Sequence, residues 1–272
     1  MAETDQEDQQ PCIIIPARYA SSRFPGKPLA RLKGAGGVER SLIEWSWRAA
    51  SRVPDVSFVT VATDDRRIAE EVERFGGTAV MTPAECANGT ERCAAAIEAL
   101  AQVPPIIVNF QGDAPLTPPT IVSSVIARMR DQPGLPVATP AILCRGLTYR
   151  HLLDDRAAGR VGGTTMVFNR HRRALYFSKN VIPYCAPGEE GATGPIYLHL
   201  GVYAYRPGAL ADYRASSPSA PELSEGLEQL RFLDMGVGVG AVVCEPPEGS
   251  MIELNNPGDI AIIEGELRRR DL

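Results

Sequence analysis

The sequence predicts an α/β protein whose core is a mostly parallel, doubly wound sheet. Short apolar runs alternate with amphipathic helical patterns through the first half of the 272 residues. The second half is richer in β-type runs, which are joined by Pro- and Gly-rich segments. Because a strand–helix–strand alternation places successive strands parallel, we expect a mixed sheet flanked by helices, with a smaller β-rich lobe.

The elements of the first half follow directly from this alternation. Apolar runs of strand length occupy residues 12–15, 56–62, 78–81 and 106–110. Helical patterns separate them at 42–52, 66–75 and 91–101. Gly76 and Gly77 end the second of these helices. A further helix begins at about Pro119, a residue suited to a first helical turn.

The second half is less regular. The expected strands are 161–168, 198–205 and 239–244, and the expected helices are 222–235 and 257–270. No internal repeat or clean linker interrupts the chain. We therefore expect a single domain over 11–272, preceded by a disordered tail over 1–10, which is acidic and lacks an apolar core.

Composition and charge narrow the class of protein. The net charge is −5 and no basic, aromatic-studded run is present, which argues against a nucleic-acid-binding module. No run approaches the ~18 apolar residues of a membrane span, and the N-terminus does not have the pattern of a signal peptide. The six cysteines show no CxxC pairing, so we expect reduced thiols in a cytoplasmic protein.

A basic loop follows the first expected strand. It carries three cations and two hydroxyls around a Pro-Gly turn, and these side chains are Arg18, Ser21, Ser22, Arg23 and Lys27. Arg binds phosphate oxygens as a fork and Lys as a point charge, so the loop predicts a polyphosphate site at the carboxyl end of a strand. It is neither a Walker A sequence nor a dinucleotide fingerprint, because both glycine frames are missing. A solvated basic loop is the alternative.

Gln111, Gly112 and Asp113 follow the last apolar strand of the first half. A carboxylate at this position, facing a basic loop, is suited to hold Mg²⁺ between the protein and a triphosphate. The alternative is that Asp113 caps the helix that follows.

Residues 88–92, Asn-Gly-Thr-Glu-Arg, precede a helix and admit two interpretations. Their amide, hydroxyl and guanidinium groups could read a pyrimidine edge by hydrogen bonds. Equally, Thr90 could cap the helix, with Glu91 near the positive end of its dipole.

His199 and Tyr203 lie four residues apart in a strand-like run, so we expect them on one face. A lone His beside apolar residues is more often structural than catalytic. Glu228 and Gln229 lie in an expected helix, where charged faces are usually solvated.

Taken in order, these segments resemble the CMP-KDO synthetase family, where KDO is 3-deoxy-manno-octulosonate. The resemblance covers about 12–259 and rests on IIIPARYASSRFPGKPL, ATDD, NGTER, QGDAP, LYFSKNVIPY, HLGVYAYR and LEQLRFL. It implies a nucleotide-diphospho-sugar transferase (Rossmann-like) fold with a CTP-binding half at about 11–135. A lobe for acceptor binding and dimerisation would span about 136–250. The implied activity is transfer of CMP from CTP, with Mg²⁺ as cofactor and pyrophosphate as product.

The resemblance also assigns roles to individual residues. The implied nucleotide-binding residues are Arg18, Ser21, Ser22, Arg23, Lys27, Asn88, Gly89, Arg92 and Gln111. The implied catalytic residues are Arg18, Lys27, which would stabilise the departing pyrophosphate, and Asp113, which would hold Mg²⁺. The implied acceptor-binding residues are Lys179, His199, Tyr203, Glu228, Gln229 and Asn255.

Three departures from the family pattern fall on the acceptor and second-metal side. The family's QGDEP is QGDAP here, its YFSR is YFSK, and the Asp of its G-V-D-x-P pattern aligns with Asn255. A sugar hydroxyl needs a base or metal to lose its proton, and a neutral Asn weakens a second metal site. A phosphonate is already an oxyanion at neutral pH and needs no such help. We therefore expect a phosphonate such as phosphonoformate, as in antibiotic biosynthesis, with KDO for lipopolysaccharide as the alternative.

The expected partners follow from the same resemblance. They are CTP, a small anionic acceptor and a second copy of the chain in a homodimer, with no nucleic acid and no membrane. A CTP-binding protein without transferase activity is a minor alternative, which the intact Lys27 and Asp113 disfavour.

Overall fold

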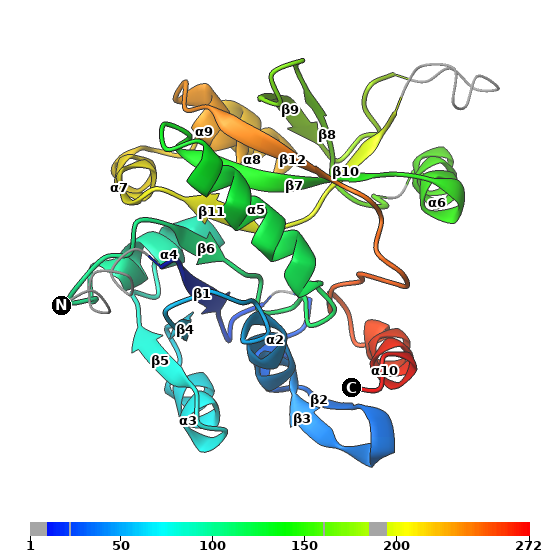
Figure 1. Ribbon diagram of the computed structural model, residues 1–272. Helices are drawn as coiled ribbons and strands as arrows, with labels where there is room; N and C mark the ends of the chain where they lie inside the picture. The colour runs from blue at the N-terminus through cyan, green and yellow to red at the C-terminus, as the bar shows by residue number, and fades with distance from the viewer. Residues whose placement is uncertain (1–9, 22, 160, 185–194) are drawn as a thin grey trace. The chain divides into compact units, whose positions relative to one another are not determined.

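The computed structural model describes residues 10–21, 23–159, 161–184 and 195–272 (Figure 1). The chain divides into two compact units, one made of 1–123 and 247–272 and the other of 124–246. Apart from Gln10, the expected tail over 1–10 lies outside the described residues. Within the described part, no helix is both long enough and apolar enough to cross a membrane. The five cysteines described there form no disulfide.

A parallel sheet forms the centre of the first unit. Its strands run in the order β5 (Thr78–Met81), β4 (Val59–Thr63), β1 (Cys12–Ala17) and β6 (Ile107–Asn109). β1 pairs in parallel with β4 on one side and with β6 on the other. All side chains from Cys12 to Ile15 are fully buried, so both faces of β1 are covered. This confirms the expected α/β class.

Three helices of the first unit begin where a polar side chain caps them. They are α2 (Leu42–Ala50), α3 (Arg66–Arg74) and α4 (Gly89–Ile97). The side chains of Ser41, Asp65 and Asn88 each accept a hydrogen bond from a backbone N–H in the first turn. Both α2 and α4 pack against β1 and β4. The capped helices therefore protect the strands whose carboxyl ends carry the polar loops.

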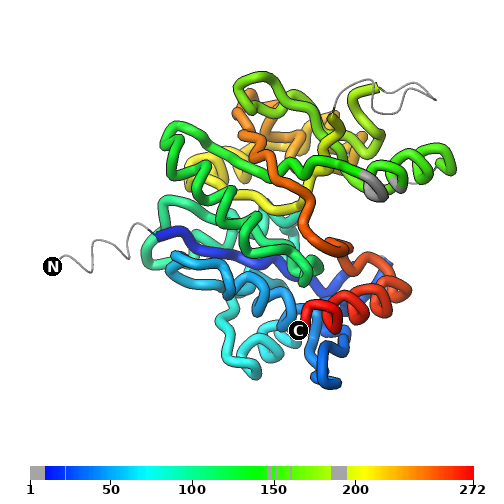
Figure 2. Tube along the Cα trace, turned by 45° about the vertical axis from the view of Figure 1, so that its right-hand side comes forward, coloured from blue at the N-terminus to red at the C-terminus, as the bar shows by residue number. Residues whose placement is uncertain are grey.

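The sequence patterns did not predict the hairpin of β2 (Arg31–Lys33) and β3 (Glu39–Ser41). Helix α10 (Asp259–Arg269) packs against this hairpin, and Figures 1 and 2 both show them side by side. The backbone N–H of Ala35, in the hairpin loop, donates to the carbonyl oxygen of Leu272. A shared hydrophobic cluster joins these elements, and its buried members include Leu32, Leu42, Trp45, Leu116, Leu254, Ile263 and Leu267. The C-terminal segment is thereby fixed within the first unit.

The second unit is built around β7 (Val137–Leu143). β12 (Val239–Cys244) runs parallel to β7, while β10 (Tyr197–His199) and β11 (Tyr203–Tyr205) run antiparallel to it. β8 (Thr165–Phe168) and β9 (Ala174–Ser178) extend the sheet beyond β10. The helices of this part are α5 (Pro119–Asp131), which leads into the unit, α6 (Gly146–Ala157), α7 (Pro207–Ala215), α8 (Ala220–Glu225) and α9 (Leu230–Asp234).

The single strand expected over 198–205 is wrong, because β10 and β11 are separate. Between them, the hydroxyl of Thr139 on β7 donates to the carbonyl oxygen of Val202 at 2.7 Å. A side chain thus satisfies a backbone group that would otherwise bond within the ladder, and the strand is interrupted there.

The single helix expected over 222–235 is also wrong. Gly226 adopts the left-handed conformation, with a φ of 62°, and ends α8. Glu228 and Gln229 therefore lie in the turn between α8 and α9 and not on a solvated helix face.

Candidate active site

The two polar loops singled out in the sequence leave neighbouring parallel strands. From β1 the chain continues to β4 and β5 on one side, and then returns to β6 on the other side. The strand order therefore reverses between β1 and β6. In open α/β sheets, ligands bind outside the carboxyl ends of the strands at this kind of position.

The basic loop after β1 depends on a glycine to fold back on itself. The backbone N–H of Gly26 donates to the carbonyl oxygen of Tyr19 at 2.9 Å, and Gly26 has a φ of 73°. A Cβ atom at Gly26 would lie 3.1 Å from the Tyr19 ring. Lys27 follows as the first residue of the short helix η1 (Lys27–Leu29). The turn thereby fixes the backbone from which the Lys27 side chain starts.

Asp113 reaches this loop because Gly112 has no side chain. A Cβ atom at Gly112 would lie 2.8 Å from the carbonyl oxygen of Pro16, at the end of β1. Lys27 Nζ donates to Asp113 Oδ2 at 2.5 Å, and both side chains are partly buried. Since α5 begins only at Pro119, the alternative that Asp113 caps this helix is wrong.

A pocket of about 320 Å³ lies at the ends of these strands. Of the residues named from the sequence, it is lined by Arg18, Ser21, Arg23, Lys27, Asn88, Gly89, Arg92, Gln111, Asp113 and Asn255. Ser22 lies outside the described residues. The basic loop is therefore not merely solvated, because its cations and Asp113 border one cavity together. A triphosphate is the kind of ligand that such a cationic cavity suits.

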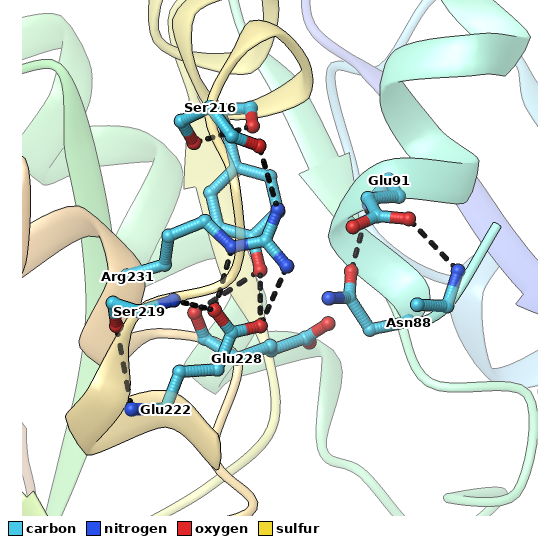
Figure 3. Close-up of polar contacts among 9 residues, drawn as sticks. Asn88, Glu91, Ser216, Ser219, Glu222, Glu228 and Arg231 are labelled. Atoms are coloured by element: carbon cyan, nitrogen blue, oxygen red, sulfur yellow. Dashed lines mark hydrogen bonds and ion pairs between the residues drawn. The ribbon is translucent and has the colours of Figure 1, made fainter.

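Residues 88–92 contribute both to helix capping and to the pocket. The side-chain oxygen of Asn88 accepts from the backbone N–H of Glu91 at 2.9 Å, so Asn88 and not Thr90 caps α4 (Figure 3). Arg92 is buried and donates to Thr82 Oγ1 at 2.7 Å and to Asp64 Oδ2 at 3.2 Å. The guanidinium of Arg92 thus secures the end of β4 while the residue borders the pocket.

Glu253 is a site residue that the sequence reasoning missed. Desolvation, followed by the nearby negative charge of Asp113, raises the pKa of Glu253 from 4.5 to about 7. Lys27, the Asn255 side chain and Arg23 act in the opposite direction. Glu253 is therefore close enough to Asp113 for the two carboxylates to interact, and Asn255, two residues further on, lines the pocket. The sequence contained one indication of this residue. Position 255 lacks the acid of the family pattern, and an acid, Glu253, lies two residues before it.

In the second unit, Tyr203 contacts both His199 and Gln229, and all three were expected from the family resemblance to bind the acceptor. The rings of His199 and Tyr203 are 5.3 Å apart, and the Tyr203 hydroxyl donates to Gln229 Oε1 at 3.1 Å. Gln229 is 2% exposed, and within the described residues its Nε2 has no hydrogen-bond partner. A buried amide donor without a partner is available to a ligand. These residues meet although β10 and β11 are separate strands.

Lys179 lies beside the turn that carries Glu228 and Gln229. Its Nζ would be 2.9 Å from a Cβ atom placed on Gly226, and its backbone N–H donates to Glu225 Oε2 at 3.0 Å. Lys179 also lines a separate pocket of about 280 Å³, together with Arg156. The exposed ammonium group of Lys179 is therefore next to the turn.

His199 is expected to make stability sensitive to acid. Burial lowers its pKa from 6.5 to about 3, so the ring is neutral near pH 7 and only weakly basic. Because the unfolded chain binds this proton more readily, the free energy of unfolding should fall as the pH drops from about 6.5 toward 3. The contribution should reach about 1.4 kcal/mol per pH unit.

Urea denaturation between pH 7 and 4.5 would measure this slope. Phe177, Tyr203 and the Thr139 hydroxyl surround the ring, so no carboxylate among these neighbours offsets the loss. The variant His199→Gln should lose most of the slope, whereas the exposed His171→Gln should keep it. Equal slopes in the two variants would contradict the assignment.

Comparison with known proteins agrees with this geometry. Residues 12–239 match the protein family described as cytidylyltransferase. The chain is 45% identical to the 3-deoxy-manno-octulosonate cytidylyltransferase of Maricaulis maris (strain MCS10), over 93% of this chain and 95% of that protein. The chain belongs to the CMP-KDO synthetase family of cytidylyltransferases.

Other members of the CMP-KDO synthetase family match over similar lengths. The 3-deoxy-manno-octulosonate cytidylyltransferase of Chlamydia felis (strain Fe/C-56) is 39% identical, over 92% of this chain and 91% of that protein. A solved CMP:2-keto-3-deoxy-manno-octonic acid synthetase complexed with CTP is 32% identical and has a TM-score of 0.81. That match covers 97% of this chain and 100% of the other. These matches confirm the expected nucleotide-sugar transferase fold and make the protein a nucleotidyltransferase that acts on CTP.

Proposed function

We propose that this protein transfers CMP from CTP to KDO and releases pyrophosphate, with Mg²⁺ as its cofactor. The observation that carries the choice of acceptor is the identity to relatives named for this substrate, up to 45% over nearly the whole chain. This reverses the order of acceptors inferred from the sequence, where a phosphonate came first. The buried hydrogen-bonding groups of His199, Tyr203 and Gln229 also suit a hydroxyl-rich sugar acid better than a compact phosphonate.

The pocket supports an in-line displacement at the α-phosphorus of CTP. The oxygen of an acceptor hydroxyl forms a bond to this phosphorus while its proton passes to water. The bond to the β-phosphate oxygen breaks, and pyrophosphate leaves with both bonding electrons. Negative charge then grows on the leaving group. Arg18, Arg23 and Lys27 line the pocket and stabilise that charge. Catalysis of this kind comes mainly from positioning and electrostatics. These residues therefore favour a transferase over a protein that only binds CTP.

The donor set of the pocket fits Mg²⁺. This ion prefers oxygen ligands and is usually held by one or two carboxylates together with substrate phosphates. Asp113 lines the pocket, and the described residues contain no group of three His, Cys, Asp or Glu side chains that could bind a metal alone. The phosphates of CTP would complete the coordination. When bound, Mg²⁺ would neutralise phosphate charge and polarise the reacting phosphorus.

Pyrophosphate release from CTP, with KDO and phosphonoformate assayed in parallel, tests the proposed acceptor. We expect kcat/KM for KDO to exceed that for phosphonoformate by at least about 100-fold, because hydrogen-bonding sites discriminate strongly against substrates that leave their groups unpaired. Chelation of Mg²⁺ by EDTA should abolish release. Turnover with phosphonoformate alone would instead restore the phosphonate acceptor.

A homodimer, which the family resemblance implies, is part of the same proposal. In its support, β9 is the terminal strand of the second unit's sheet, and its Leu175 and Tyr176 are exposed. A strand at the edge of a sheet that carries exposed apolar side chains is suited to contact a second copy. Light scattering after size-exclusion chromatography should give twice the monomer mass. The monomer mass would contradict this part of the proposal.

A further inference from the structure

The segment 253–255 is held against the end of the loop that carries Asp113. The backbone N–H of Leu254 donates to the carbonyl oxygen of Asp113 at 2.9 Å. The Leu254 side chain is fully buried in the hydrophobic cluster between the hairpin and α10. The neighbours Glu253 and Asn255 are partly exposed. Leu254 is thus buried in the cluster, whereas the Glu253 and Asn255 residues on either side of it are accessible to solvent.

Asn255 connects Glu253 to the basic loop. Its Oδ1 accepts from Arg23 Nη2 at 2.9 Å, and its side chain acts to lower the pKa of Glu253. An amide can accept from Arg23 and donate to Glu253 at the same time. An Asp at 255 could not donate, and it would place a third negative charge beside Asp113 and Glu253. Asn at 255 is therefore the residue that accommodates Glu at 253.

Glu253 and Asp113 also form an electrostatic pair. Each lies close enough to Lys27 and to the other for their charges to interact. Apart from Asp113, the charged groups that line this pocket are cations suited to phosphates. Two carboxylates that repel each other beside a phosphate-binding loop are an arrangement that a divalent cation stabilises.

We propose that Glu253 supplies the second carboxylate of the Mg²⁺ site, together with Asp113, in place of the acid that the family carries at position 255. This rests on the proposed Mg²⁺-dependent function. The carboxylate has moved by two residues along the chain and has not been lost. If Glu253 supplies the second carboxylate, the Asn at position 255 is not a reason to expect a phosphonate acceptor.

Metal affinity can be measured without turnover. Mn²⁺ binding to the full-length protein is followed by electron paramagnetic resonance, with CTP present and no acceptor. Glu253→Gln should weaken Mn²⁺ binding at least about tenfold, as losses at metal sites typically do. The variant carrying both Glu253→Gly and Asn255→Asp, which restores the family arrangement, should regain most of the affinity. Glu70→Gln, at an exposed position on α3, is the matched control and should bind as the wild type does.

The outcomes separate this inference from the proposed function. Unchanged Mn²⁺ affinity in Glu253→Gln would overturn the inference. So would an equal loss of CTP binding measured without metal, because the pocket itself would then be damaged. If wild-type protein with CTP bound no Mn²⁺, the proposed metal dependence would fail instead. Glu253 would be supported as a ligand by two results together. Glu253→Gln should weaken metal binding but leave metal-free CTP binding intact, and the variant carrying both Glu253→Gly and Asn255→Asp should recover metal binding.

Discussion

Replacing Lys27 with Met is expected to lower kcat for CMP transfer by about 10²–10³-fold, the usual effect of removing one preorganised group that stabilises developing charge. Lys27 is held in place by Asp113 at 2.5 Å, and its side chain is only 15% exposed. Its charge is therefore weakly screened by water and, in the proposed reaction, would act at short range on the leaving pyrophosphate. Met keeps the length of the side chain and removes the charge. Steady-state pyrophosphate release at saturating CTP measures the loss.

Lys33→Met is the matched control, because Lys33 ends β2 with an exposed side chain. Its kcat should stay within about twofold of the wild type, as a substitution away from the reacting groups leaves transition-state stabilisation intact. Circular dichroism should show both variants folded. If Lys27→Met raised KM for CTP while leaving kcat unchanged, Lys27 would contribute only to ground-state binding.

Much of the fold could be predicted because local patterns decide it. The bounds expected for β5 and β12 agree with the structure, since both are apolar runs between clear stops. The hairpin was missed because only Leu32 of β2 is buried, between the exposed Arg31 and Lys33, so no apolar run marks it. The interruption between β10 and β11 depends on a partner strand, and a local pattern cannot show it.

The candidate site shows the same division. The loops after β1 and β6 were predictable, because each joins an apolar strand to charged side chains. Glu253 could have been found from its spacing to Asn255, since residues two apart in an extended segment share a face. The burial of Arg231 could not have been found. A charged residue in a helical pattern is usually solvated, and here the burial depends on side chains from α7 and α8.

The second large effect is expected at Arg231, whose replacement by Met should lower the free energy of unfolding by about 3–5 kcal/mol. Arg231 is 1% exposed, and its guanidinium donates to both carboxylate oxygens of Glu222, at 2.6 and 2.7 Å (Figure 3). It also stacks on the Tyr213 ring at 4.1 Å. Met would fill part of the space but leave the Glu222 carboxylate buried without its counter-charge. Urea denaturation at neutral pH measures the loss.

This ion pair also bears on the proposed acceptor-binding residues, because it holds the turn between α8 and α9. The Tyr213 hydroxyl lies 3.2 Å from the carbonyl oxygen of Glu228, the residue before Gln229. Arg231→Met should therefore raise KM for the acceptor more than KM for CTP, since the nucleotide pocket is lined by residues of the first unit.

Combining Arg231→Met with Glu222→Gln should restore part of the stability, because the buried carboxylate charge left without a partner is removed. Arg268→Met, at an exposed pair with Glu264, should change stability by less than about 1 kcal/mol. Similar losses at Arg231 and Arg268 would mean that burial does not strengthen this pair.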